Sequence, residues 1–266
     1  MKLYPKRGFE FSSEACTGLW CPVLTGNTGY QVLDSNLTTN NHGNAVGYAN
    51  TSQPWRGSER GTILDFDGTN DNIILTPDRA IYAMPFSVSV WALARNVTQN
   101  LVVFSVGSST SANPLFIVAF RGDSSGDPLQ IQMRGSNGVN SVCNGSGFVA
   151  NRFYHVVGVF ESETSRTVYV DGVQGQTDTT SHTATTLDRV TIGALVRTTS
   201  GQFFNGQVAE VCVRSRALTP LETRRLYDVG PGGAWQFEPR RRSSYFAELL
   251  QLPNRRRSSR FLGFPG

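Results

Sequence analysis

The sequence is short of charge and of long apolar runs, and each shortage excludes a class of protein. Asp, Glu, Lys and Arg make up 17% of the 266 residues, against about 25% in an average soluble domain. No apolar run approaches the roughly 18–20 residues that span a bilayer, so we expect no membrane partner. The first residues, with Lys2, Lys6 and Arg7, lack the apolar stretch of a signal peptide, so we expect synthesis without secretion.

Cysteine and histidine are also sparse. The four cysteines are Cys16, Cys21, Cys143 and Cys212. The spacing between Cys16 and Cys21 fits neither a two-residue redox motif nor a zinc knuckle. With only three histidines, a zinc site would need ligands gathered from distant segments. We therefore expect reduced thiols in a cell interior rather than a disulfide scaffold or a zinc protein.

Small polar residues take the place of the missing charges. Gly, Ser, Thr and Asn account for 93 of the 266 residues, and such residues favour strands, turns and loops over helix interiors. Phe86–Trp91 alternates with a period of two, as a half-buried strand does. Arg152–Phe160 is apolar on both faces, which is typical of a strand in the middle of a sandwich. Asp171-Gly172 then predicts a tight hairpin.

Further strands are expected throughout the chain from residue 60 onward. They cover Thr62–Asp67, Ile73–Leu75, Leu101–Val106, Leu115–Arg121, Leu129–Arg134, Thr167–Val170, Val190–Leu195 and Gln207–Arg214. About ten short strands separated by turns predict an all-β fold, a two-sheet antiparallel jelly-roll sandwich.

One short helix is expected near residues 219–229. Thr219 is its predicted N-cap, Pro220 its first residue, and Glu222 completes a capping box. Gly230 is placed to end it. Its apolar face is predicted to consist of Leu221, Leu226 and Tyr227.

The C-terminal segment differs from the rest of the chain in charge. Residues 239–266 carry seven Arg and one acid, a net charge of +6, whereas residues 1–238 sum to −2. Arg-Arg-Arg-Ser-Ser occurs at 240–244 and again at 255–259. A segment this short, with two basic runs, cannot bury a core of its own. We therefore expect this extended arm to become ordered only on another surface.

The arm supplies the predicted partner-binding residues. Apolar anchors and arginines are interleaved in it: Trp235, Phe237, Arg240, Arg241, Arg242, Tyr245, Phe246, Arg255, Arg256, Arg257 and Arg260. The favoured partner is an acidic neighbouring subunit, with the aromatic side chains as anchors. Contact with nucleic-acid phosphates is a less favoured alternative, and a solvated end without a partner is another.

Six segments in order resemble a known family. They are Leu64–Ile73, Pro85–Trp91, Tyr154–Phe160, Val168–Gly172, Phe204–Val211 and Arg216–Glu222. Together they resemble the laminin-G-like jelly roll of the concanavalin A-like lectin/glucanase superfamily, over roughly residues 15–230. The resemblance implies two curved antiparallel sheets and, in many members, binding of glycans or proteins. It divides the chain into an N-terminal arm (1–15), a jelly roll (16–230) and the basic arm (231–266).

Catalytic residues of the family's hydrolases have no counterpart in this sequence. Those enzymes place two Glu around an Asp on one strand, and no Glu-x-Asp-x-x-Glu pattern occurs here. Glu161 and Glu163 are the nearest pair, but their neighbours mark a hairpin turn. His155 lies in an apolar strand, where a core histidine is expected, and no Ser/His/Asp set follows from spacing. We expect no enzymatic activity and no cofactor.

One turn offers weak calcium ligands. Asp67, Asp71 and Asn72 could supply oxygens to Ca²⁺, and some laminin-G-like domains bind this ion. The favoured alternative is that these side chains hydrogen-bond the tight turn itself. Arg121-Gly122-Asp123 matches an adhesion tripeptide, although a plain loop explains it more simply.

The sequence as a whole predicts a virion structural or decoration protein. The Trp-Gln-Phe-Glu-Pro-Arg-Arg-Arg ending resembles structural proteins of tailed bacteriophages. In this hypothesis the arm docks on neighbouring subunits of a virion homo-oligomer and the jelly roll faces outward, where it contacts host glycans. Alternatives are a free extracellular glycan-binding lectin or adhesion module and, less favoured, a glycoside hydrolase.

Overall fold

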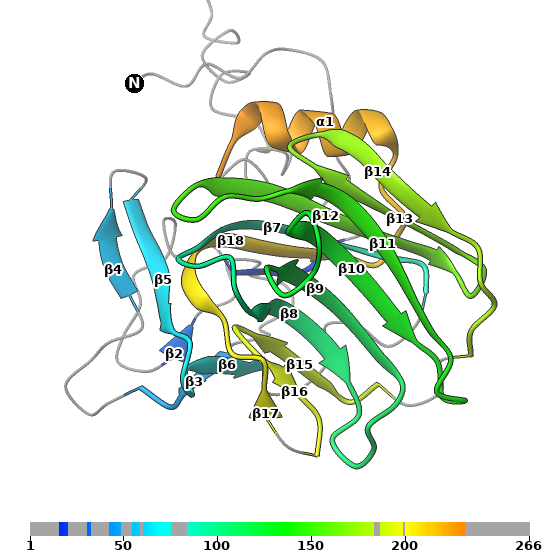
Figure 1. The fold of residues 1–266 in the computed structure, drawn as a ribbon, viewed down its shortest axis with the longest axis horizontal. Coiled ribbons are helices and arrows are strands. Elements are labelled where there is room, and N and C mark those ends of the chain that lie inside the picture. The colour runs from blue at the N-terminus through cyan, green and yellow to red at the C-terminus, as the bar shows by residue number, and fades with distance from the viewer. Residues whose placement is uncertain are drawn as a thin grey trace, which may run out of the picture.

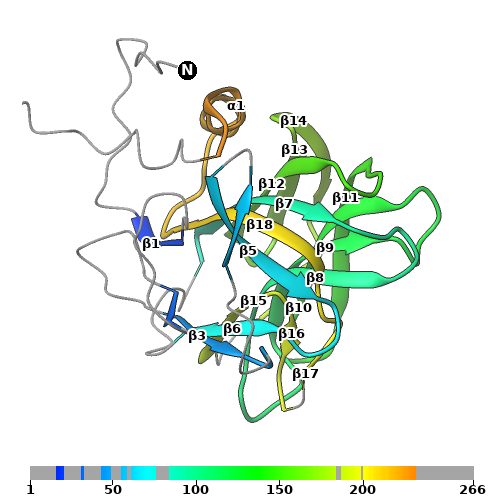
Figure 2. The same cartoon turned by 90° about the vertical axis from the view of Figure 1, so that its left-hand side faces the viewer.

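The computed structural model describes residues 16–20, 31–32, 43–48, 55–58, 61–75, 84–183, 187–198 and 200–231. Within them the chain forms two eight-stranded antiparallel sheets and one helix, α1 (Pro220–Val229). The sheets stack face to face, and α1 lies outside the first sheet (Figures 1 and 2). The predicted all-β, two-sheet jelly-roll sandwich is therefore confirmed.

The first sheet lies beneath the helix, and its strand order is β14-β13-β12-β7-β18-β5-β4, with β1 paired to β18. The strands are β14 (Val173–Asp178), β13 (Ser165–Val170), β12 (Phe153–Ser162), β7 (Phe86–Ala94), β18 (Asn205–Arg214), β5 (Gly61–Asp67), β4 (Trp55–Ser58) and β1 (Cys16–Trp20). The most apolar strands, β12 and β7, pair with each other at the centre, as predicted for Arg152–Phe160.

The second sheet has the order β11-β10-β9-β8-β15-β6-β3-β2. Its strands are β11 (Asn140–Gly147), β10 (Pro128–Arg134), β9 (Leu115–Arg121), β8 (Asn100–Gly107), β15 (Arg189–Ile192), β6 (Asn72–Leu75), β3 (Gly43–Val46) and β2 (Gln31–Val32). A separate hairpin of β16 (Leu195–Val196) and β17 (Ser200–Gly201) lies beside β8 (Figure 1).

Aromatic side chains join the two sheets across the core. Phe86 of β7 stacks on Phe160 of β12 at 4.7 Å, and Phe116 of β9 meets Phe86 edge-on at 5.1 Å. All three are essentially buried, and each buried Phe stabilises the fold by roughly 1.5–3 kcal/mol. Because successive side chains of a strand point to opposite faces of its sheet, these three lie on the facing sides of the two sheets.

Helix α1 begins as predicted. The Thr219 side chain accepts a hydrogen bond from the Glu222 N–H, and the Glu222 carboxylate accepts one from the Thr219 N–H. Leu226 is buried against the first sheet, but Leu221 is 53% exposed, so its predicted place on the apolar face is wrong. Leu221 and Leu226 are five residues apart, so their side chains point about 140° apart around the helix axis. Leu221 therefore points to solvent.

Most predicted strands are confirmed, but their number was underestimated, because eighteen occur in the described residues. Leu115–Arg121 coincides with β9, and Asp171 and Gly172, with φ of 50° and 74°, form the turn between β13 and β14. The missed strands include β11 and β14, whose sequences are mostly polar. Such edge strands lack the alternating pattern that identifies a half-buried strand.

Candidate functional site

The predicted calcium residues meet in the turn between β5 and β6. Asp67 Oδ1 accepts from the N–H groups of Thr69 at 2.7 Å and Asn70 at 3.4 Å. Asp71 Oδ2 accepts from the Asp67 N–H at 3.1 Å, and the Asn72 amide donates to Asn70 O at 3.0 Å. These contacts are the hydrogen-bonded turn favoured above. In the described residues no group of three or more His, Cys, Asp or Glu is arranged to hold a metal, and calcium binding stays a prediction.

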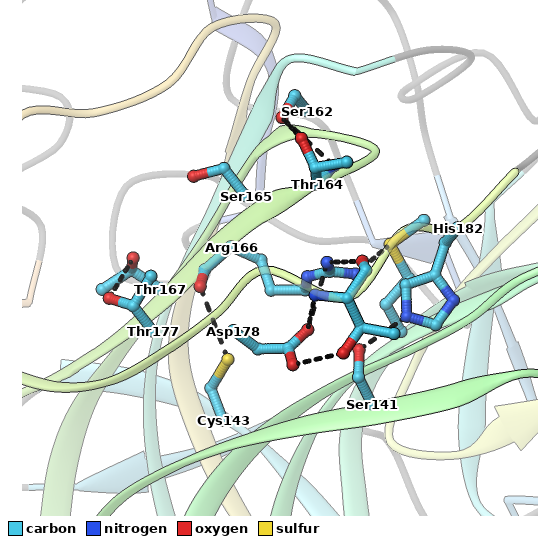
Figure 3. Close-up of polar contacts among 12 residues, drawn as sticks. Ser141, Cys143, Ser162, Thr164, Ser165, Arg166, Thr167, Thr177, Asp178 and His182 are labelled. Carbon is cyan, nitrogen blue, oxygen red and sulfur yellow. Dashed lines mark hydrogen bonds and ion pairs between the residues drawn. The ribbon is translucent and has the colours of Figure 1, made fainter.

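A Ser, a His and an Asp come together at one end of the sandwich, which spacing did not suggest. Ser141 Oγ lies 2.7 Å from His182 Nε2 (Figure 3), and Ser141 also hydrogen-bonds the Asp178 carboxylate. The serine therefore lies between the two other groups, whereas a nucleophilic triad needs the histidine in the middle. Ser141 and His182 are also buried. We interpret the set as a structural network.

Arg166 is the centre of this network. Its guanidinium is 1% exposed and lies 3.1 Å from the Asp178 carboxylate (Figure 3). Burial raises the pKa of Asp178, but hydrogen bonds from Thr180 and Ser141, together with Arg166, more than offset this and hold it below its usual range. Burial raises the pKa of the nearby Cys143 thiol to about 11, so it is protonated at neutral pH and unreactive.

The remaining residues considered for catalysis lie in structural positions. Glu161 and Glu163 are both exposed at the β12–β13 hairpin, where Glu161 accepts from Ser165 at 2.9 Å. His155 is fully buried, and its Nε2 lies 2.8 Å from Ser89 Oγ. The core-histidine interpretation is therefore confirmed, as is the hairpin position of the two glutamates.

The Arg121-Gly122-Asp123 segment is folded on itself. Arg121 Nε lies 2.7 Å from Asp123 Oδ1, so the two charges of the tripeptide engage each other. A Cβ at Gly122 would lie 2.2 Å from the Val97 backbone, which explains the glycine by close packing. The plain-loop interpretation accounts for this segment.

The described part of the surface includes a helix-side hollow and a second-sheet hollow. The helix-side hollow, of about 460 Å³, is lined by Trp91, Arg152, Phe153, Asp171, Tyr227 and Asp228. Its rings already stack on each other, because Trp91 lies 5.8 Å from Tyr227 and 4.9 Å from His155. Arg152 pairs with Asp171 at 2.9 Å. Most of these groups therefore engage one another, although the buried Trp91 Nε1–H has no acceptor within the described residues.

The second-sheet hollow, of about 250 Å³, lies on the face of the second sheet that points away from the core. It is lined by Asn100, Leu115, Ile117, Arg121, Gln132, Arg134, Asn140, Val142, Leu195, Arg197 and Gln202. Cross-strand pairing fixes this face, because Ile117 lies opposite Gln132, which lies opposite Val142. Leu115, Arg134 and Asn140 form the next row on the same face.

The floor of the hollow is apolar. Leu115, Ile117 and Leu195 belong to a cluster that is separate from the main core, together with Val102 and Ala119. Leu115 and Ile117 are each 2% exposed, although they lie on the outer face. These side chains therefore form a packed apolar layer beneath the hollow, and polar groups provide most of the surface that a ligand would meet.

Amide side chains border this floor. Arg121 donates to Gln130 Oε1 at 2.9 Å, and the Gln130 amide donates to Asn144 Oδ1 at 2.6 Å. Gln132 likewise hydrogen-bonds Asn140. The Asn100 Oδ1 atom is buried and has no hydrogen-bond partner within the described residues, which is a costly arrangement unless something else donates to it.

The β16–β17 hairpin closes one side of the hollow. Gln202 O accepts from the Val102 N–H at 3.0 Å, which fastens the hairpin to β8. Gln202 has a φ of 51°, a left-handed conformation that is uncommon in non-glycine residues. Such conformations cluster at ligand-binding positions.

Sequence reasoning missed this hollow, although part of its signal is visible. Leu129–Arg134 was predicted as a strand, and its polar residues 130, 132 and 134 occupy alternate positions, so they must share one face. That face is the hollow. The hairpin with Leu195 and Arg197 gives no comparable signal, because only the folded chain brings it to β8.

The other predicted site lies outside the described residues. This applies to both arms, 1–15 and 232–266, and to every predicted partner-binding residue: Trp235, Phe237, Arg240, Arg241, Arg242, Tyr245, Phe246, Arg255, Arg256, Arg257 and Arg260. Their docking role stays a prediction. Among the residues that are described, no helix has the length and apolar character for crossing a bilayer.

Solved structures similar to this chain include binding domains. Domain 4 of AbnA, a GH43 extracellular arabinanase from Geobacillus stearothermophilus, solved with arabinotriose, is 19% identical with a TM-score of 0.60, over 81% of this chain and 98% of that one. The receptor binding domain of botulinum neurotoxin mosaic serotype C/D is 12% identical (TM-score 0.61, 81% and 51%). Trypanosoma rangeli sialidase is 13% identical (TM-score 0.56, 81% and 33%).

These likenesses concern the fold, and this chain spans only about half of the toxin domain and a third of the sialidase. No curated protein matches the sequence. A family model does, however: that of the concanavalin A-like lectin/glucanases superfamily matches residues 67–223, more than half of the chain. The chain therefore belongs to the concanavalin A-like lectin/glucanases superfamily.

Proposed function

We propose that this protein is a non-enzymatic carbohydrate-binding module that holds a saccharide in the second-sheet hollow. One observation carries the proposal: amide and guanidinium groups converge on a single sheet face, above a packed apolar layer of Leu115, Ile117 and Leu195. Sugar rings have apolar faces and polar edges, so the amide and guanidinium groups offer partners for the edges, and Val142, which is 37% exposed, offers an apolar contact for a face.

The absence of enzymatic activity is part of the proposal. Ser141 lies between His182 and Asp178, an order that gives the serine no oriented base. Among the described residues, none that lines the hollow carries a carboxylate, whereas most glycoside hydrolases use two. Both observations favour binding without hydrolysis.

The family and one similar structure support a saccharide as the ligand. The arabinanase domain was solved in complex with arabinotriose, and this chain spans 98% of it. The fold itself hosts many functions, so the ligand class is argued from the lining of the hollow rather than from the likeness.

A blocking substitution tests the proposal. Val142 is 37% exposed in β11 and lines the hollow, whereas Val173 is 61% exposed in β14 of the other sheet. Val142→Trp should abolish binding to a glycan array, because the indole ring is larger than the valine side chain and fills the hollow. Val173→Trp is the matched control and should bind as the unaltered protein does. Equal binding by both variants would contradict a site at this face.

We keep attachment within a virion as a second candidate function, because the net charge of +6 in residues 239–266 favours docking on an acidic surface. In this hypothesis the jelly roll displays the hollow outward from a virion homo-oligomer. A chain ending at Gly233 tests it. The truncated protein should fail to join particles while its jelly roll still folds, and normal incorporation would refute the docking role.

A further inference from the structure

The charged side chains among the described residues that line the second-sheet hollow are all arginines. They are Arg121, Arg134 and Arg197, and the other described lining residues carry amide or aliphatic side chains. Arginine keeps its charge at every physiological pH. A ligand for this hollow therefore meets only positive charge along the lining, which disfavours cations and favours anions.

The three arginines are not equivalent. Arg121 forms an ion pair with Asp123 at 2.7 Å and donates a hydrogen bond to Gln130 at 2.9 Å, so much of its positive charge is already neutralised. Arg134 and Arg197 form no ion pair within the described residues, and Arg197 has a single long contact to Ala112 O at 3.3 Å. The Arg134 Nε atom is buried with no acceptor in that part of the chain.

The two unneutralised arginines lie at the same end of the hollow. Arg134 lies directly opposite Leu115 in the β9–β10 pair. Arg197 reaches Ala112, three residues before Leu115. Arg121 lies six residues further along β9, which is about 20 Å away in an extended strand. The hollow therefore has a cationic end at Leu115 and a neutralised end at Arg121.

We infer that the saccharide bound in this hollow is acidic and places a carboxylate or sulfate group at the Leu115 end, between Arg134 and Arg197. This inference rests on the proposed function and specifies its ligand class. The planar guanidinium fork matches both oxyanions with two parallel hydrogen bonds. The exposed Val142 side chain, which lines the same hollow, then offers an apolar contact to the neighbouring sugar rings.

Binding by the full chain to three kinds of immobilised oligosaccharide tests the inference: oligogalacturonate with carboxylates, dextran sulfate with sulfates, and dextran as the neutral counterpart. The unaltered protein should retain at least one acidic ligand more strongly than dextran. Arg134→Gln and Arg197→Gln should each weaken that binding by about tenfold, the loss of one charge-assisted pair. Which acidic ligand responds identifies the oxyanion.

Three further variants make the result specific. Arg134→Lys keeps the charge without the fork and should give an intermediate loss, and Arg121→Gln should give a smaller loss than Arg134→Gln. Arg152→Gln, in the helix-side hollow, should bind unchanged. The inference would be overturned if dextran bound more strongly than either acidic ligand, or if Arg134→Gln left binding of the acidic ligand unchanged.

The Val142→Trp variant separates this inference from the proposed function. If Val142→Trp still abolished binding in those cases, the hollow would remain supported as the binding site. Binding that Val142→Trp leaves unchanged would overturn both the inference and the proposed function.

Discussion

His155 is a neutral ring enclosed between the first sheet and helix α1. It stacks on Trp91 at 4.9 Å, and its Nε2 lies 2.8 Å from the Ser89 hydroxyl. Burial lowers its pKa to about 3, whereas an exposed histidine titrates near 6.5. Between these two values the unfolded chain binds a proton that the folded chain does not, so the free energy of unfolding falls as the pH falls.

A pH comparison measures this residue's contribution. Lowering the pH from 7 to 5 should cost the unaltered protein about 2 kcal/mol more than it costs His155→Gln, whose side chain does not titrate. Urea denaturation at the two pH values gives both differences. His182, whose pKa is also lowered by burial, is present in both proteins and cancels. Equal losses in the two proteins would show that His155 is not buried in neutral form.

The buried Arg166–Asp178 pair allows a second test at the scale of single residues. Asp178→Ala leaves a guanidinium that is 1% exposed without its carboxylate, so the free energy of unfolding should fall by about 3 kcal/mol. The matched control is Asp228→Ala, because Arg224 and Asp228 are each 52% exposed in their pair. That change should cost no more than about 0.5 kcal/mol by the same urea titration. Similar losses in both would refute the structural role of the network.

At the scale of elements, α1 depends on its N-terminal capping box. Thr219→Ala removes the acceptor for the Glu222 N–H and should lower the free energy of unfolding by about 1 kcal/mol. Leu221→Ala, at an exposed position in the same turn, should change it by less than about 0.5 kcal/mol. Thermal unfolding followed by circular dichroism measures both. A larger loss in Leu221→Ala would mean that this side chain packs against the sheet after all.

Elements with a local signal could be predicted from the sequence. The capping box of α1 and the Asp171-Gly172 turn are encoded within a few neighbouring residues, and β9 is encoded by its unbroken apolar run. Polar edge strands such as β11 carry no such pattern, because neither of their faces is fully buried. The prediction that Leu221 lies on the apolar face of α1 was wrong, because the apolar character of one residue does not determine which face of a helix it occupies.

At the scale of the whole molecule, the candidate site depends on contacts that no local pattern contains. The hollow combines Ile117 of β9, Gln132 of β10 and Val142 of β11 with Leu195 from a hairpin far along the chain. The strand register and the bond from Val102 N to Gln202 O bring these groups together. The sequence was enough to predict the two-sheet fold, but it pointed to the basic arm as the binding site. Runs of charge can be recognised in a sequence, whereas the side chains that share a sheet face across several strands cannot.

The most direct test of the carbohydrate-binding claim is an NMR titration of the isotope-labelled full chain with the oligosaccharide that it retains best. We predict that the backbone amide shifts change on β9, β10, β11 and the β16–β17 hairpin, with the largest changes near Leu115. Amides around Trp91 and Tyr227 should stay unchanged. Shifts concentrated in the helix-side hollow, or none on the outer face of the second sheet, would contradict the account.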